Sequence, residues 1–322
     1  MAALIGAFAL GTAIGLGALA LVLTTRSEDA ARTSYVEAPT TAPGAPNVDY
    51  TLDLRTGLKT PLPDALIVSV ASFGRSPETK YAVSSDGSRL AYVGLGDDDN
   101  PQIFVADIDG TGIRQVTHDS REAMSPTWSP DGTSVAYVGY GADAAANSRR
   151  LFVVELATGK SRQLTRTGEV VWDPQFTPDG LSLLYTGATN QVPLLMTVPV
   201  AGGKSTLFLG PGEGVEDAGN GSLSPDGSLV TFLGSGFPDS FDGRHCGPCR
   251  LVANADGTDR RVIPGWYVNP AGAWSPDGSR IVESRDDRSI VVVDIATGDE
   301  SRVAEGRAAI WLDRHTLLID VA

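Results

Sequence analysis

The sequence predicts an all-β fold, a six-bladed β-propeller, over residues 48–322, preceded by one N-terminal transmembrane helix. Three observations predict the propeller: a short turn motif that recurs along the segment, an alternating apolar pattern after each copy, and two ends that complement each other. Units of roughly 45 residues that each contain four strands are typical of propeller blades.

The recurring turn is Ser-Pro-Asp-Gly or a close variant. Serine at the first place, proline at the second and glycine at the fourth suit a type I turn, because proline presets its φ angle. Apolar residues at alternate positions follow each copy, as in a half-buried strand. A second turn, such as "IATGD", comes later in each unit, so each unit has four strands. The copies begin at residues 84, 129, 177, 224 and 275, and a degenerate sixth copy covers residues 311–315.

The two ends of the repeat region each contain half a unit. After the sixth turn the chain ends with "TLLIDVA", so this unit has its first two strands only. The other two strands are predicted in "VDYTLDLRTGLKTPL", at the start of the region. Joining residues 310–322 to residues 48–62 gives a composite blade that closes the ring and removes exposed sheet edges.

Residues 1–25 contain no charged side chain and are long enough to cross a bilayer as a helix. A cleaved signal peptide is the alternative, but the basic start is missing and apolar residues continue beyond the Ala-Leu-Ala cleavage candidate at 18–20. Residues 26–47 are polar and rich in alanine, proline and threonine, which predicts a flexible linker. We therefore expect a signal anchor, a linker and a propeller domain over residues 48–322.

The charge pattern bears on location and on partners. Arg26 and Arg32 follow the apolar segment and, by the positive-inside rule, favour a cytoplasmic domain. The acidic domain and its cysteine pair favour the opposite side, and we expect the propeller outside the cytoplasm, periplasmic or extracellular. A formal net charge of −14 argues against nucleic acid, whose binding needs basic patches. The expected partners are a protein or envelope ligand, and the membrane through residues 1–25.

The segments "SPTWSPDGTSVAYVGY" and "RLFVVELATGKSRQLT" resemble the repeat of TolB-type β-propellers, also described as WD-repeat-like. The resemblance covers essentially all of residues 48–322, with departures at Ser85, which replaces proline, and in the sixth turn. It implies the propeller fold and a use as an interaction scaffold, a sensor domain or a gate on a peptidase. The translocation protein of that family has an additional N-terminal α/β domain, whose place is taken here by the apolar segment and linker.

Binding residues are expected in the loops between the second and third strands of each blade, because these loops vary most. The repeated turns lie on the opposite face and are interpreted as structural. Residues 97–100 could offer oxygen ligands to Ca²⁺, although a solvated acidic loop without a cofactor is the preferred interpretation. The candidate ligand- or partner-binding residues are Asp97, Asp98, Asp99, Asn100, Asp143, Arg149, Asp239, Asp242, His245, Asp286 and Asp287.

The only two cysteines, Cys246 and Cys249, form a Cys-Gly-Pro-Cys motif. A thioredoxin-type dithiol needs a helix N-terminus at its first cysteine, because the helix dipole lowers the thiol pKa. A strand is expected after this motif, so we predict a structural disulfide that closes the loop in an oxidising compartment. A metal site with His245 and Asp242, a redox-active dithiol and free thiols are the alternatives.

Enzyme signatures are missing from the sequence. It has no Gly-x-Ser-x-Gly nucleophile motif, and its three histidines, His118, His245 and His315, have no metal-ligand spacing. We therefore predict a non-catalytic protein- or ligand-binding scaffold or sensor. One alternative is an envelope polysaccharide lyase or hydrolase that uses the propeller channel, to which the inner strands offer Asp173. The other alternative is a redox protein that uses the cysteine motif.

Overall fold

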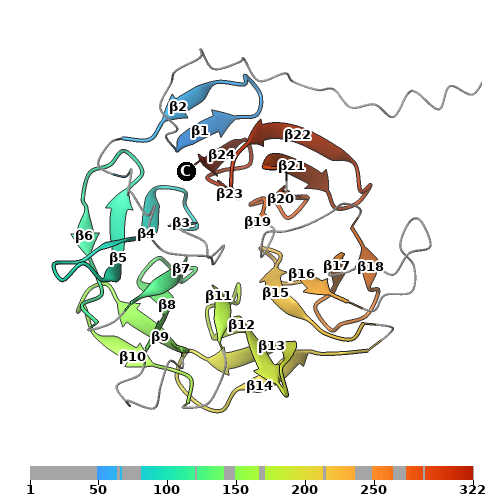
Figure 1. Ribbon diagram of the computed structural model, residues 1–322, viewed down its shortest axis with the longest axis horizontal. Coiled ribbons are helices and arrows are strands. Elements are labelled where there is room, and N and C mark those ends of the chain that lie inside the picture. The colour runs from blue at the N-terminus through green and yellow to red at the C-terminus, as the bar shows by residue number, and fades with distance from the viewer. Residues whose placement is uncertain are drawn as a thin grey trace, which may run out of the picture. The chain divides into compact units, whose positions relative to one another are not determined.

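The computed structural model describes residues 49–63, 66, 81–119, 122–140, 149–166, 171–212, 215–235, 249–263, 273–285 and 287–321. They belong to one compact unit, Ser34–Ala322. Within it the described residues form six four-stranded antiparallel sheets, arranged around a central axis as the blades of a propeller (Figure 1). The prediction of a six-bladed all-β propeller is confirmed. Among these residues there is no helix of sufficient length and apolarity to cross a membrane, and the predicted anchor, residues 1–25, and linker, residues 26–47, lie outside the described residues.

Each blade is a meander in which the first strand lies nearest the axis and the fourth lies at the outer edge (Figure 1). Blade 1 contains β3 (Tyr81–Val83), β4 (Arg89–Leu95), β5 (Pro101–Asp107) and β6 (Arg114–Gln115). Blade 2 contains β7 (Met124–Trp128), β8 (Ser134–Tyr140), β9 (Arg149–Glu155) and β10 (Ser161–Gln163). Blade 3 contains β11 (Trp172–Phe176), β12 (Ser182–Thr189), β13 (Val192–Pro199) and β14 (Thr206–Leu209). Blade 4 contains β15 (Gly219–Leu223), β16 (Leu229–Gly234), β17 (Cys249–Asn254) and β18 (Arg261–Val262). Blade 5 contains β19 (Ala273–Trp274), β20 (Arg280–Ser284), β21 (Ser289–Asp294) and β22 (Glu300–Glu305).

The sixth blade is composite, as the sequence predicts. Its inner strands are β23 (Ala308–Trp311) and β24 (Thr316–Asp320), and its outer strands are β1 (Tyr50–Asp53) and β2 (Lys59–Pro61). Strand β1 pairs with β24 in antiparallel register, with Tyr50 opposite Ile319. Asp49 ties this closure together, because its carboxylate accepts the Val321 backbone N–H at 3.0 Å and the Tyr81 hydroxyl of blade 1 at 2.6 Å.

Apolar cores fill the spaces between neighbouring blades. An aliphatic residue on the third strand of one blade packs with an aromatic residue on the second strand of the next: Ile103 with Tyr137, Leu151 with Tyr185 and Leu195 with Phe232. Inner-strand tryptophans also connect the blades through indole N–H bonds to the preceding inner strand: Trp128 to the Ala82 carbonyl at 3.1 Å, Trp274 to Ser222 at 2.9 Å and Trp311 to Ala273 at 3.0 Å. Adjacent blades are therefore held together by both packing and polar contacts.

Candidate functional site

The meander divides the connections between two faces of the propeller. The turns from the first to the second strand and from the third to the fourth lie on one face, which we call the turn face. The connections from the second to the third strand and from blade to blade lie on the other face, which we call the loop face. The two faces differ in how their polar groups are used.

The turn face uses its polar side chains to hold its own backbone. In blade 2, Ser129 Oγ donates to Asp131 Oδ1 at 2.6 Å, and the same oxygen accepts the Thr133 N–H at 3.0 Å. The Gly132 N–H closes the turn on the Ser129 carbonyl at 2.9 Å, with Gly132 at a φ of +67°. The arrangement recurs in blades 1, 3, 4 and 5, with its aspartate at Asp86, Asp179, Asp226 and Asp277.

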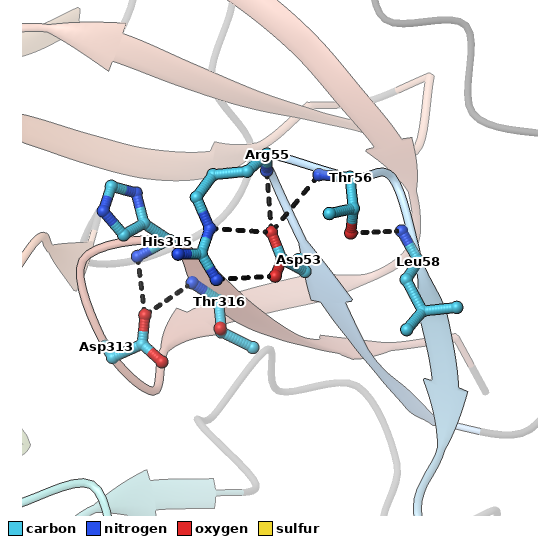
Figure 2. Close-up of polar contacts among 7 residues, drawn as sticks. All are labelled: Asp53, Arg55, Thr56, Leu58, Asp313, His315 and Thr316. Carbon is cyan, nitrogen blue, oxygen red and sulfur yellow. Dashed lines mark hydrogen bonds and ion pairs between the residues drawn. The ribbon is translucent and has the colours of Figure 1, made fainter.

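The closing blade has its own version of these turns (Figure 2). Asp313 Oδ1 accepts the backbone N–H of His315 at 2.7 Å and of Thr316 at 3.0 Å. On the neighbouring turn Asp53 accepts the Arg55 guanidinium, and this side-chain bond lowers the pKa of Asp53 to about 2. The geometry supports the interpretation of the repeated aspartates as turn formers.

The acidic loop of blade 1 is exposed on the loop face. Residues Asp97, Asp98 and Asp99 follow β4 as a tight turn, in which the Gly96 N–H bonds the Asn100 carbonyl at 2.9 Å. Asn100 Nδ2 donates to Asp98 Oδ2 at 3.2 Å, and Asp99 has a φ of +59°. Among the residues that the structure describes, no group of three or more His, Cys, Asp or Glu side chains could hold a metal ion. The calcium interpretation therefore gains no support from this loop.

The other predicted loop-face residues fall into two groups. Arg149 is the first residue of β9, and Asp287 is exposed before β21, where its Oδ1 accepts the Ser289 N–H at 2.8 Å. Asp287 therefore acts as a turn former, and its bonds to Ser289 lower the pKa of its carboxyl. The remaining candidates, Asp143, Asp239, Asp242, His245 and Asp286, lie outside the described residues.

Of the two cysteines, Cys249 is buried as the first residue of β17, whereas Cys246 lies outside the described residues. The predicted disulfide between them stays a prediction. The strand that follows the motif is observed, with Cys249 opposite Gly234 of β16. From Cys249 onward the described residues form a strand of a blade, whereas a thioredoxin-type motif leads into a helix.

The sequence reasoning missed a buried ion pair between blades 4 and 5. Arg250 Nε lies 2.8 Å from Glu283 Oε1, and the two side chains are 0% and 2% exposed. Burial raises the pKa of Glu283, and the charges of Arg250 and Arg285 oppose this shift. Beside the pair, Arg285 Nη2 lies 2.5 Å from Glu300 Oε1. One charged side chain of blade 4 and three of blade 5 thus lie close enough to influence one another.

The ion pair occupies the position where other blades have apolar contacts. Arg250 lies opposite Leu233, just as Ile103, Leu151 and Leu195 lie opposite the equivalent residues of their blades. Glu283 takes the aromatic position, which Tyr92, Tyr137, Tyr185 and Phe232 take in blades 1 to 4. An acid at a position that is aromatic in four blades and isoleucine (Ile319) in the sixth was the sequence signal that could have revealed it.

The inner strands carry little ionisable chemistry. In the described inner strands (β3, β7, β11, β15, β19 and β23) Asp173 is the single charged side chain. It follows Trp172, whose side chain is exposed at the loop-face end of β11. A lyase or hydrolase that uses a pair of carboxylates would need a second acid, which these strands do not supply.

A family model described as the TolB beta propeller domain matches residues 66–236, which is more than half of the chain. The chain belongs to this family. The TolB-type propeller is 42% identical over 53 residues to the Tol-Pal system protein TolB of Actinobacillus succinogenes, a match that covers 16% of this chain and 12% of that protein.

Two solved structures share the fold of this TolB-type propeller. Putative TolB from Agrobacterium tumefaciens aligns with a TM-score of 0.61 at 17% identity, over 84% of this chain and 96% of that chain. Oligogalacturonate lyase from Vibrio parahaemolyticus aligns with a TM-score of 0.51 at 15% identity, over 79% of this chain and 74% of that chain. At these identities the structures are evidence for the fold alone.

Proposed function

We propose that the chain is a non-catalytic binding protein, a scaffold or sensor, that contacts a protein or an envelope ligand through its loop face. The observation that carries this proposal is the contrast between the two faces. The turn face repeats one self-satisfied hydrogen-bond arrangement in blade after blade, whereas the loop face departs from the repeat in length, charge and composition. Binding residues concentrate in variable loops that a rigid scaffold positions.

The family supports a binding role. The relative from Actinobacillus succinogenes is named the Tol-Pal system protein TolB, that is, one protein of a system. The match covers 12% of that protein. We therefore infer from it only the chemical class of partner for this chain, and no individual partner. That class is a partner that is itself a protein.

The location proposed for the propeller is outside the cytoplasm, tethered by residues 26–47 to an anchor in residues 1–25. Two features of the sequence support this: the uncharged N-terminal segment is long enough to span a bilayer, and a disulfide between Cys246 and Cys249 would persist in an oxidising compartment. The chain as a whole has a net charge of −14, and such an acidic balance suits a protein that remains soluble beside a membrane.

The enzyme and redox alternatives have less support. Likeness to an oligogalacturonate lyase concerns the fold, and the described inner strands contain one acidic residue, Asp173, where a carboxylate pair would need two. The cysteine motif leads into strand β17, whereas the dithiol of a thioredoxin-type enzyme leads into a helix. Among the residues that the structure describes, no arrangement of reactive groups supports either alternative.

The proposal is tested by capturing partners with the full-length tagged chain in membranes and comparing two sets of surface variants. The loop-face set replaces Leu95, Asp97 and Asp98 with alanine, and the turn-face set replaces the exposed Leu58, Ile113 and Leu181 with alanine. We expect the loop-face set to reduce the yield of a specific partner several-fold and the turn-face set to leave it unchanged. The reverse pattern would contradict the proposal.

A further inference from the structure

The outer strand of blade 3 differs in composition from the outer strands of the other blades. Strand β14, at the outside of blade 3 (Figure 1), reads Thr-Leu-Phe-Leu and contains neither a charged residue nor a proline. Each of the other outer strands contains a basic residue: Lys59 in β2, Arg114 in β6, Arg162 in β10, Arg261 in β18 and Arg302 in β22. Charged residues and prolines on an edge strand discourage pairing with a further strand. The edge of β14 lacks this protection and is the outer edge best suited to such pairing.

Apolar side chains accompany this edge. Leu207 of β14 is 59% exposed, and its partner across the ladder, Met196 of β13, is partly buried. Leu194 and Leu207 lie beside Gly210, where an added Cβ would be 3.5 Å from a methyl carbon of each. Leu194 is also partly buried. This apolar strip offers the side chains of a docked strand a surface to pack against.

Basic side chains lie at the turn that leads into β14. Arg162 of β10 in blade 2 reaches this turn, because its Nη2 donates to the Val200 carbonyl. Its Nη1 would lie 3.6 Å from a Cβ added at Gly202. Lys204 follows in the same turn, and Lys160 lies two residues before Arg162; all three basic residues are exposed. Among the described residues, neither lysine forms an ion pair.

The charge of this region is opposite to that of the whole chain. The chain has a net charge of −14, whereas residues 156–166 and 192–212 contain four basic side chains and no acidic one. Complementary charge steers a partner to such a region and suppresses partners of the same sign. A partner strand with acidic side chains is therefore favoured here. A second copy of this chain is disfavoured, because pairing β14 with β14 would bring the same basic residues of both copies together.

We propose that β14 binds an extended acidic segment of a partner protein, which adds a fifth strand to blade 3. Main-chain hydrogen bonds supply affinity in this mode of binding, and alternate side chains of the added strand supply specificity. An apolar side chain of the segment packs against Leu207, and its acidic side chains pair with Lys204 and Arg162.

This surface goes beyond the proposed loop-face function, because it lies on the outer rim of the ring. Through Met196 and Tyr185, Leu207 is two strands across and four residues along from Leu181 of the turn face. At ordinary strand spacings this separation is roughly 16 Å. A segment paired with β14 therefore leaves both Leu181 and the loop face uncovered.

The test measures the binding of fluorescent peptides to the full-length chain in detergent micelles by fluorescence anisotropy. The acidic probe is a short peptide that alternates valine and glutamate. One control replaces each glutamate with glutamine, and another has N-methylated amides, which cannot donate main-chain hydrogen bonds. We expect saturable binding of the acidic probe, several-fold weaker binding of the glutamine probe and no binding of the N-methylated probe.

Variants of the chain locate the peptide. Leu207→Glu should abolish binding of the acidic probe by repulsion. Leu181→Glu, at an exposed leucine of the same blade, is the matched control and should leave binding unchanged, because it lies beyond a Debye length from β14. Lys204→Gln should weaken binding by about 1.5- to 5-fold, the range expected for one exposed ion pair.

Several results would overturn the inference. Absence of saturable binding by the acidic probe would reject it outright, and equal binding of the glutamine probe would show that charge is not recognised. Binding of the N-methylated probe would exclude strand addition, and equal binding by Leu207→Glu and Leu181→Glu would place the peptide elsewhere. A dimer of the chain that Leu207→Glu dissociates would assign the edge to a second copy. None of these results changes the partner capture expected of the loop-face variants, so failure of this inference is distinguishable from failure of the proposed function.

Discussion

Blades 2 and 3 meet through Leu151 and Tyr185, whereas blades 4 and 5 meet at the same place through Arg250 and Glu283. The first contact is apolar and suits a buried interface. The second removes two charges from water, a cost that their mutual attraction offsets only in good geometry. Since the fold is built elsewhere with the apolar solution, this departure is not needed to form a propeller. Departures from a consistent local pattern are expected at functional or strained sites, and Arg250 follows closely, in sequence, the long connection that contains Cys246.

Breaking one partner of the ion pair should have the largest effect on stability. Glu283→Gln removes the carboxylate charge that lies 2.8 Å from the buried Arg250 Nε, and we expect the free energy of unfolding to fall by about 3–5 kcal/mol. Denaturant titration of the full-length chain, followed by the fluorescence of the buried tryptophans, measures this change.

The matched control restores the apolar solution of the other blades. The double variant Arg250→Leu with Glu283→Tyr should be close to the wild type in stability or more stable by about 1–4 kcal/mol. A double variant that is as unstable as Glu283→Gln would show that the position requires charge, and the comparison between the two interfaces would fail.

The ring closure should show the next largest effect. Tyr81→Phe removes the 2.6 Å bond to Asp49, whose carboxylate is buried, so we expect a loss of about 1.5–3 kcal/mol. Tyr137→Phe, which removes a 2.8 Å bond to Asp119 within the ring, is the matched control. Limited proteolysis should reveal early release of β1 and β2 in Tyr81→Phe and not in Tyr137→Phe. The same early release in both variants would argue against Asp49 as the specific tie.

Acid should weaken the turn face through its aspartates. The Ser224 and Ser228 bonds lower the pKa of Asp226 from 3.8 to about 2. A lowered native pKa means that the stabilisation is present above the unfolded value of 3.8 and is lost as the pH falls through about 2. Allowing for solvent screening, we expect about 0.5–1 kcal/mol from Asp226. Urea titrations between pH 5 and pH 2 should show this loss in the wild type and a smaller loss in Asp226→Asn.

The acidic loop should matter least to folding. Asp98→Asn changes an exposed side chain that accepts a hydrogen bond from Asn100 Nδ2. The free energy of unfolding should therefore stay within about 0.5 kcal/mol of the wild type. Thermal unfolding measures this directly. A loss above 1 kcal/mol would place this loop with the structural turns and weaken the distinction between the two faces.

Much of the fold could be predicted from the sequence, because each blade repeats its own turn chemistry. The spacing of Ser-Pro-Asp-Gly and the half-units at the two ends predict six blades and the pairing of β1 with β24, which is confirmed. The contacts of the candidate site were harder to predict. Arg250 and Glu283 are 33 residues apart, and their contact depends on how two blades meet in space.

The central claim, that partners bind the loop face, is tested most directly by site-specific photo-crosslinking in membranes of cells that express the chain. A photoreactive amino acid replaces either Leu95 on the loop face or Leu181 on the turn face, both of which are exposed leucines at 47% and 69%. The account predicts a discrete crosslinked partner from position 95 and none from position 181. A discrete partner from position 181 alone would contradict it.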